Sequence, residues 1–310
     1  MMKNRKYLVG LAVLPFLAFC TKDDVQTPSF DITVEAREYK INDSVRFIIK
    51  DAPDVLSFYS GEKGKEYQYR DRIVVEGRRK ELALNTQIIY GSQTDNLKIM
   101  VSNDFTGTYD EASVKKATWK DITSKFTLST SPINLLGPRV SSGKVDITDD
   151  IIAGKPLFVG FKYVGLASPG TASTQRGWRI YGFDLTTTDK DGTSTSIATR
   201  TNAGWSPVNI IDAVSPTTGA SKWIYVADMF YYDPMSSLVE SEGWYITKGF
   251  LPDNMSPDKG TPIKDYTQRR TSYAYSFKAE GEYTVTFVGS NVNYTGEKEV
   301  VKEFKIKVVK

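Results

Sequence analysis

The sequence has no histidine and a single cysteine among its 310 residues. Without histidine, Ser-His-Asp and Cys-His nucleophilic mechanisms are excluded, and so is zinc catalysis with histidine ligands. Glycoside hydrolysis needs only two carboxyl groups at a suitable separation. The chain has 37 acidic residues, and no local signature marks any two of them as a pair. We therefore expect a protein that is not an enzyme, and a carboxylate-dependent glycoside hydrolase is kept as an alternative.

Long apolar runs are scarce as well. The clearest run, YLVGLAVLPFLAF, occupies 13 residues after Lys3, Arg5 and Lys6. A membrane-spanning helix needs about 20 residues, whereas a basic start followed by a shorter apolar run is typical of a secretory signal. We predict that residues 1–19 form a signal peptide. Cys20 follows it, and a lone cysteine cannot form an internal disulfide, so the cores must be held together by packing.

The chain has no strong net charge of either sign. The formal net charge is +3, and the predicted signal peptide carries three basic residues and no acidic one, so the predicted mature chain is neutral. A neutral chain has no electrostatic footprint for nucleic acid or for an anionic membrane surface. We therefore expect no nucleic-acid partner.

Strand signals begin soon after the signal peptide. In FDITVEA (30–36) and SVRFIIK (44–50), apolar and polar residues alternate, which is typical of strands with one buried face. About four strand-like segments precede Gly77, fewer than the seven or so of an immunoglobulin-like sandwich. Alternating segments return at the end of the chain, at 273–291 and 303–310.

The closing segment resembles the signature of PKD-type immunoglobulin-like modules. The matching residues are Tyr275-Ser276-Phe277, Gly281, Tyr283-Thr284-Val285-Thr286-Phe287 and Asn291. The aromatic-plus-glycine element that normally precedes this signature is similar to residues 58–62, far upstream. The resemblance implies an all-β fold in which an immunoglobulin/PKD-like sandwich, built from 30–77 and 269–310, is split by a domain inserted at 78–268. Two incomplete sandwiches in tandem are the alternative.

The inserted segment is also predicted to be all-β. Alternating segments near 97–101, 157–163 and 177–188 are separated by turn residues, which favours a jelly-roll-like β-sandwich. The best candidate for a helix is 110–119. Four stretches resemble jelly-roll domains of Bacteroidetes surface lipoproteins: VSNDFTG (101–107), ATWKDIT (117–123), SGKVDITDDIIAGKPLFVGFKY (142–163) and GWRIYGFDL (177–185). That group has no assigned catalytic residues, so the resemblance implies no catalytic site.

The start of the predicted mature chain carries a second resemblance. Residues 17–20, Leu-Ala-Phe-Cys, resemble a lipobox, in which the signal is cut before a cysteine that becomes lipid-modified, although Phe19 stands where a small residue is usual. CTKDD (20–24) is similar to the acidic export tag of lipoproteins on the outer face of the outer membrane in Bacteroidetes-type bacteria. The resemblance implies lipid attachment at Cys20, a tether over 20–29 and an outer-membrane, cell-surface location. An ordinary signal peptide followed by a chance cysteine is the alternative.

The tryptophans are unevenly distributed. All five lie in the predicted insert, at positions 119, 178, 205, 223 and 244. Flat aromatic rings stack on the C–H faces of sugars, and polar neighbours bond the hydroxyl groups. Trp205, in a turn-rich stretch, is the first candidate for a ligand-binding ring. Tyr231 and Tyr232 come next, because adjacent residues cannot both face the core of a strand, and Trp223 completes the set.

Two acidic groups provide possible oxygen ligands for a structural Ca²⁺. One is Asp146, Asp149 and Asp150, and the other is the turn that contains Asp189 and Asp191. Neither spacing matches a defined metal loop, and Asp-x-Asp-Gly is also ordinary turn chemistry. We therefore expect no cofactor and no metal, with calcium at Asp189 and Asp191 kept as the alternative.

Taken together, these features favour a cell-surface lipoprotein that binds a polysaccharide or oligosaccharide without cleaving it. The resemblance extends to the surface glycan-binding proteins of polysaccharide-utilisation systems, which implies carbohydrate capture for uptake and an outer-membrane transporter complex as partner. A protein-interaction or adhesion module is the alternative. Exposed aromatic rings in a concave strip with polar neighbours would favour a glycan, whereas a flat apolar patch would favour a protein partner.

Overall fold

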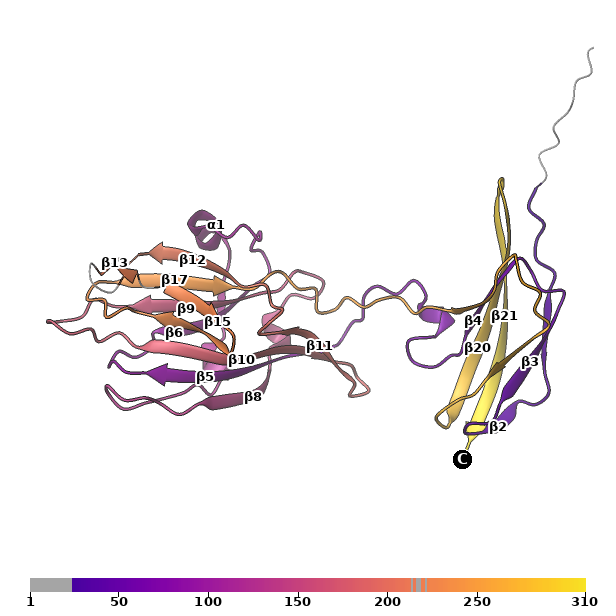
Figure 1. The fold of residues 1–310 in the computed structure, drawn as a ribbon, viewed down its shortest axis with the longest axis horizontal. Coiled ribbons are helices and arrows are strands. Elements are labelled where there is room, and N and C mark those ends of the chain that lie inside the picture. The colour runs from indigo at the N-terminus through magenta and orange to yellow at the C-terminus, as the bar shows by residue number, and fades with distance from the viewer. Residues whose placement is uncertain (1–23, 213, 216–218, 221) are drawn as a thin grey trace, which may run out of the picture. The chain divides into compact units, whose positions relative to one another are not determined.

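The computed structural model describes residues 24–212, 214–215, 219–220 and 222–310. The predicted signal peptide (1–19) and the predicted lipid-attachment residue, Cys20, lie outside these described residues. Strands dominate the described chain (Figure 1), which confirms the predicted all-β class. Among the described residues, no helix has the length and apolar character that a membrane span requires.

The chain forms two compact units. The first contains the chain up to Asp71 together with Pro257–Lys310, and we call it the end-built unit. The second is Arg72–Ser256, which we call the inserted unit. The protein is thus an immunoglobulin/PKD-like sandwich that is split by an inserted β-sandwich.

The end-built unit consists of two sheets. Its elements are β1 (Asp31–Val34), β2 (Glu38–Lys40), β3 (Val45–Lys50), β4 (Val55–Tyr59), the 3₁₀ turn η1 (Tyr67–Tyr69), β18 (Thr261–Lys264), β19 (Ser272–Tyr275), β20 (Gly281–Asn293) and β21 (Gly296–Val309). One sheet has the order β1-β3-β19, and the other has the order β18-β4-β20-β21-β2. The pairs are antiparallel except for β2 with β21, which are parallel.

Strands from the two ends of the chain pair directly with one another. Val45 in β3 lies opposite Tyr275 in β19, and Phe58 in β4 lies opposite Phe287 in β20. The alternation in β3 places every second side chain in the core. Among the described residues, the buried members of this core all come from the two ends of the chain, and they are Phe30, Ile32, Val45, Phe47, Ile49, Leu56, Phe58, Ile263, Phe277, Val285, Phe287, Ile306 and Val308. Neither end of the chain therefore has a complete core without the other.

The glycine of the upstream aromatic element has a definite role in this packing. Gly61 has a φ of +79°, and a Cβ atom at this position would lie 2.6 Å from the backbone oxygen of Thr284 in β20. A side chain is excluded both by this contact and by the left-handed conformation. The Tyr275 hydroxyl donates to the Glu62 carboxylate next to this glycine. The early motif and the closing motif are thus in direct contact.

The boundaries of the insert differ from those expected at 77/78 and 268/269. Residues 261–264 belong to the end-built unit because β18 pairs with β4. Residues 72–77 belong to the inserted unit because Val74 forms an antiparallel bridge with Asn254. Short pairings of this kind leave little trace in an alternation pattern.

The inserted unit contains the remaining elements. They are β5 (Arg79–Ile89), β6 (Leu97–Ser102), α1 (Glu111–Lys116), β7 (Lys120–Asp121), η2 (Thr123–Lys125), β8 (Val140–Asp146), η3 (Thr148–Asp150), β9 (Phe158–Gly165), β10 (Gly177–Thr188), β11 (Ser194–Thr199), β12 (Ser206–Ile211), β13 (Val214–Ser215), β14 (Gly219–Ala220), β15 (Lys222–Val226), β16 (Met229–Asp233) and β17 (Ser241–Ile246). One sheet has the order β15-β16-β10-β5-β8, with β11 also on β10, and a second has the order β12-β17-β9-β6-β7. β13 and β14 pair as a small hairpin.

Aromatic side chains fill the space between the two large sheets. Phe161 of β9 contacts Phe183 of β10 and Phe230 of β16, with ring centroids 6.5 and 5.3 Å apart. All three rings are buried. This packing joins the sheets face to face, as expected for a β-sandwich.

A smaller apolar layer covers the outer face of the second sheet. The short helix α1 begins after Asp110, whose carboxylate accepts a hydrogen bond from the Ser113 amide at 2.7 Å. Val114 of this helix packs with Phe158 and Trp244. The predicted helical segment at 110–119 is therefore confirmed, although the helix is only six residues long.

The substitution Ile306→Ala tests whether the last strand belongs to the core of the end-built unit. Ile306 is fully buried, so removing its methyl groups leaves a cavity, and the free energy of unfolding of this unit should fall by about 2–5 kcal/mol. Ile48→Ala is the matched control, because the Ile48 side chain is 37% exposed, and its cost should stay below about 1 kcal/mol. Urea unfolding followed by circular dichroism measures both, and equal losses would contradict the assignment.

Candidate functional site

Two of the predicted ligand-binding rings lie inside the inserted unit. Trp223 is 5% exposed and Tyr232 is 0% exposed. Tyr232 stacks on Tyr163 with ring centroids 3.7 Å apart, and the Trp223 indole N–H donates to the Gly243 carbonyl at 3.0 Å. Trp223 lies opposite Tyr232 in the β15–β16 pair, so both face the core. Their prediction as exposed binding residues is wrong.

The other two rings are separated from each other. Tyr231 is half-buried and points to the side of β16 opposite Tyr232. Trp205 closes an edge of the core, since its ring stacks on Tyr245 at 5.3 Å and its N–H donates to the Arg200 carbonyl at 2.8 Å. The turn-rich sequence around Trp205 suggested exposure, but the turn folds this ring onto the core. The four rings therefore form no common platform.

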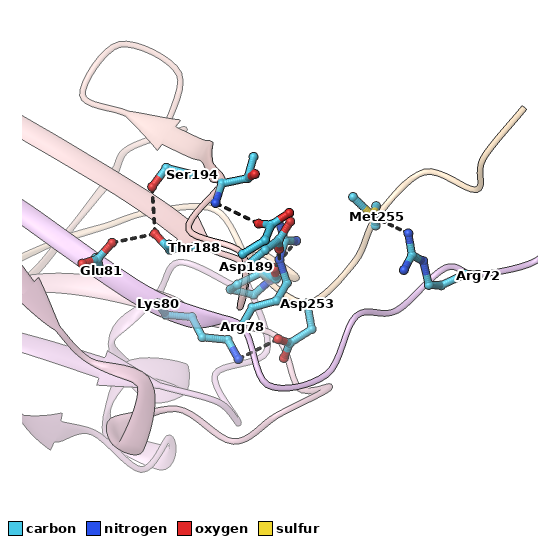
Figure 2. Close-up of polar contacts among 12 residues, drawn as sticks. Arg72, Arg78, Lys80, Glu81, Thr188, Asp189, Ser194, Asp253 and Met255 are labelled. Carbon is cyan, nitrogen blue, oxygen red and sulfur yellow. Dashed lines mark hydrogen bonds and ion pairs between the residues drawn. The ribbon is translucent and has the colours of Figure 1, made fainter. Parts of the chain in front are cut away.

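The predicted calcium turn is part of a charged cluster near the first strand of the inserted unit (Figure 2). The Asp189 carboxylate contacts the Arg78 guanidinium at 2.8 Å, and Arg78 is 2% exposed. Asp191 accepts a hydrogen bond from the Thr193 amide at 2.9 Å, as in an ordinary turn. Within the described part of the chain, no three His, Cys, Asp or Glu side chains are grouped as metal ligands. A guanidinium thus stands beside Asp189, where the calcium hypothesis places a cation.

The same cluster joins the chain where it enters and leaves the inserted unit. Lys80 in β5 pairs with Asp253 at 2.6 Å, and both residues are buried. Arg78 also donates to the Pro252 carbonyl at 3.2 Å, and Figure 2 shows the two basic side chains reaching toward the outgoing chain. We call Arg78, Lys80, Asp189 and Asp253 the neck cluster. Its role is structural, because each charge faces an opposite charge.

A cleft of the inserted unit lies at the end of β6. Its volume is about 620 Å³, within the range of small-molecule sites. Its lining residues come from the end of β6, the start of β7 and the segment around η3, and they are Val101, Ser102, Asn103, Asp104, Thr118, Lys120, Asp149, Asp150, Ile151, Ile152 and Lys155. The lining thus combines polar and charged side chains with isoleucines.

Two carboxylates of the cleft are held in place. The Asp150 side chain is 3% exposed, and it pairs with Lys120 at 2.7 Å and with Lys125. Burial opposes ionisation, but the two ammonium groups outweigh it and lower the pKa of Asp150. Asp104 accepts hydrogen bonds from the Ser102 hydroxyl and the Thr118 amide, both at 2.8 Å. Burial again opposes ionisation, but these hydrogen bonds outweigh it and lower the pKa of Asp104.

Other groups of the cleft face solvent. The Asn103 side chain is an exception, because it bonds the rim of the cleft. It donates to the Pro156 carbonyl at 2.8 Å and accepts from the Ile152 amide at 3.0 Å. Asp149 and Lys155 are exposed, and their side chains form no hydrogen bond or ion pair with the described residues. The Ile152 side chain is 62% exposed. The cleft therefore offers a ligand an apolar surface together with one carboxylate and one ammonium that have no ion-pair partner among the described residues.

A comparison of the chain with protein families found a match. Residues 19–205 match the family described as "Domain of unknown function (DUF5017)". The chain belongs to this family. The DUF5017 match includes every residue that lines the cleft and runs across the boundary at Asp71 between the two units. Searches of curated proteins and of solved structures found no match.

Most of this cleft in the DUF5017 chain leaves no signal in the sequence. The acidic spacing suggests Asp149 and Asp150 as calcium ligands, but Asp150 faces two lysines instead. No local pattern marks Asn103, Asp104 or Lys155, because each is an ordinary loop residue until the fold brings the segments together. The stretches VSNDFTG and SGKVDITDDIIAGKPLFVGFKY, which carried the family resemblance, contain most of the lining.

The neck cluster can be tested by removing one of its charges. Lys80→Met leaves Asp253 buried without its counterion, so the free energy of unfolding should fall by about 3–5 kcal/mol. Lys115→Met is the control, because Lys115 pairs with Glu111 on the surface and such a pair contributes less than about 1 kcal/mol. Tryptophan fluorescence during urea unfolding reports the inserted unit, which contains all five tryptophans. A cost for Lys80→Met as small as that of the control would contradict the assigned role.

The Asp150 pairing predicts a pH dependence of stability. Its pKa is lowered in the folded state, so its contribution is complete above the unfolded value near 4 and is lost as the pH falls through the lower folded value. The free energy of unfolding of the wild type should therefore exceed that of Asp150→Asn at neutral pH, and the difference should shrink below about pH 4. Denaturant unfolding between about pH 2.5 and 7 measures this. A constant difference across that range would contradict the pairing.

Proposed function

We propose that this chain is an exported lipoprotein that binds a neutral oligosaccharide or polysaccharide at the cell surface without cleaving it. The observation that carries the proposal is the cleft at the end of β6, which combines fixed charged groups with an apolar wall. Sugars present hydroxyl groups that both donate and accept hydrogen bonds, together with apolar C–H faces. A cleft with carboxylate, ammonium and isoleucine side chains matches these three features.

Two properties of the cleft suit binding. The ion pairs and hydrogen bonds of Asp150 and Asp104 hold these groups in place before a ligand arrives, which reduces the cost of ordering them on association. The lining contains two lysines and three aspartates, so it carries no excess of positive charge for an acidic sugar. We therefore expect a neutral glycan in preference to a uronic-acid polymer.

The pKa directions argue against Asp104 and Asp150 as the general acid of a glycosidase. A glycosidase keeps one carboxylic acid protonated by raising its pKa. Here the pKa of Asp104 and that of Asp150 are both lowered, so both groups stay ionised at neutral pH. These two carboxylates therefore support binding without catalysis.

The proposed location depends on residues outside the described part of the chain. The lipobox-like residues 17–20 and the acidic CTKDD stretch (20–24) support lipid attachment at Cys20 on the outer face of the outer membrane. Capture of glycan there would serve an outer-membrane transporter complex, as in the Bacteroidetes lipoproteins that the sequence resembles. The predicted neutral charge of the mature chain supports the absence of a nucleic-acid partner.

Affinity electrophoresis with residues 24–310 tests the proposal. The panel contains an α-glucan, a β-glucan, a mannan, a xylan and one uronic-acid polymer. We expect at least one neutral polymer to retard the protein. The double variant Asp149→Asn/Lys155→Met should weaken the retardation about tenfold, because it removes the two exposed charges of the cleft that have no ion-pair partner among the described residues. The control is Asp184→Asn/Lys222→Met, which removes one exposed charge of each sign from the other sheet.

Three outcomes would contradict the proposal. They are an absence of retardation by every polymer, retardation that the cleft variant leaves unchanged, and release of reducing ends from a polymer that binds. The second candidate function is a protein-interaction module. It is favoured by exposed aliphatic side chains on loops of the inserted unit, including Ile133, Leu135 and Leu166.

A further inference from the structure

The first described residues of the chain pack on the end-built unit. Val25, Pro28 and Phe30 are buried, and the Asn291 side-chain amide in β20 donates to the Gln26 carbonyl at 3.0 Å. Figure 1 shows the tip of the β20–β21 hairpin at the same end of this unit as the indigo start of the described chain. The chain is therefore fixed to the end-built unit from Val25 onward.

The predicted lipid-attachment residue is only a few positions away from this end. Cys20 precedes Asp24, the first described residue, by four positions. A chain spans at most about 3.6 Å per residue, so the backbone of Cys20 lies within about 14 Å of that of Asp24. A lipid on Cys20 would therefore hold this end of the end-built unit close to the membrane surface.

Hydrogen bonds join other segments of the unit at the same end. The Asp54 amide donates to the Asn291 side-chain oxygen at 3.0 Å, and the Val292 amide donates to the Asp54 carboxylate at 3.3 Å. The Lys264 ammonium donates to the Asp54 carbonyl at 2.9 Å. We call residues 24–26, 51–54, 264–268 and 291–296 together the anchor end. Bonds among its own segments thus fix its shape.

The anchor end carries the two most exposed large hydrophobic side chains among the described residues. Tyr266 is 81% exposed and Tyr294 is 79% exposed. Val292, near the tip of the hairpin, is 51% exposed. Tyrosine combines an apolar ring with a polar hydroxyl group, and it is enriched where lipid meets water. The exposed side chains of the anchor end therefore suit the interface of a membrane.

The same three-residue turn presents both tyrosines. The two turns are Asp265-Tyr266-Thr267 and Asn293-Tyr294-Thr295. In each turn, the side chain of the first residue accepts hydrogen bonds from the amide and the hydroxyl group of the threonine. These bonds account for the Asp or Asn and for the threonine, but they place no demand on the residue between them. Folding of the turns thus does not explain the aromatic rings.

We propose that the anchor end rests on the lipid surface of the membrane, with Tyr266 and Tyr294 at the level of the headgroups. This inference rests on the proposed lipid attachment at Cys20, whose short reach selects a membrane as the occupant. Tyr294 lies at a projecting tip, because Asn293 and Gly296 are the last paired residues of the hairpin. Such a tip fits a surface, whereas small ligands bind in concave sites.

The charge and the size of the contact agree with this role. Residues 290–296 contain no charged side chain, so the hairpin tip can enter the headgroup layer without removing an ion from water. Two tyrosines and a valine form a small contact, and the cost of association would prevent them from holding a free protein on a membrane. A lipid on Cys20 keeps the tip at a high local concentration beside the surface, which removes most of that cost. The contact then limits rotation of the end-built unit about its anchor.

Tryptophans added at the anchor end test the contact. The predicted mature chain, residues 20–310, has Cys20 as its only thiol, so maleimide-phosphatidylethanolamine in phosphatidylcholine vesicles anchors it there. The five native tryptophans lie in the inserted unit, and their signal is subtracted with the anchored wild type. Brominated acyl chains should quench most of the emission added by Tyr266→Trp and by Tyr294→Trp. The control is Ala279→Trp, which is exposed near the opposite end of β20 and should not be quenched.

Partition between water and vesicles measures the strength of the contact. A single tetradecyl chain on Cys20 gives only weak, reversible membrane binding, so a second attachment changes the partition coefficient. Tyr266→Ser/Tyr294→Ser should lower this coefficient about tenfold. Ile48→Ser/Val301→Ser is the matched control, because it removes two exposed apolar side chains of the same unit away from the anchor end, and it should leave the coefficient unchanged. Urea unfolding verifies that each variant is folded.

Two results would overturn the proposal. They are an absence of quenching at both added tryptophans in the anchored chain, and a partition coefficient that the tyrosine variant leaves unchanged. Because the lipid is attached chemically, these results depend neither on glycan binding nor on modification of Cys20 by the cell. The mass of the Cys20 peptide from cell membranes tests that modification separately, so failure of the proposed lipid attachment is distinguished from failure of the surface contact.

Discussion

The architecture depends on strand pairing between the two ends of the chain. β3 and β4, near the start, have their partners in β18, β19 and β20, near the end. The core that these strands enclose includes no described residue of the inserted unit. The intervening chain must therefore leave and return at adjacent points, and the bridge between Val74 and Asn254 and the ion pair between Lys80 and Asp253 hold it there. Loss of one partner from a buried ion pair is strongly destabilising. The neck cluster is therefore more sensitive to mutation than a surface loop.

Much of the fold could be predicted from the sequence. Alternation in 44–50 and 303–310 indicated strands with one buried face, and β3 and β21 lie there. Gly61 was part of an upstream motif that had no nearby partner, and it lies against Thr284 in the structure. The exact points of insertion were not visible, because they depend on short pairings such as β18 with β4, which carry no periodic pattern.

The functional residues were harder to predict than the strands. Trp205 lies in a turn-rich stretch, which indicated exposure, yet its ring closes the core against Tyr245. Tyr231 and Tyr232 were expected to differ in orientation, and Tyr232 is the inward one. The residues of the cleft are ordinary Asp, Asn and Lys residues in separate loops. Only tertiary structure brings Asp104 and Lys155 to one surface, so no local pattern could have selected them.

Removal of the insert shows whether the two ends of the chain form a core of their own. A chain in which a short flexible linker replaces residues 72–256, joining Asp71 to Pro257, retains every residue of the end-built core. This chain should unfold in one cooperative transition in urea, with amide hydrogens of β3, β4 and β20 protected from exchange. An unfolded chain without protected amides would show that strands from the two ends do not fold together without the insert.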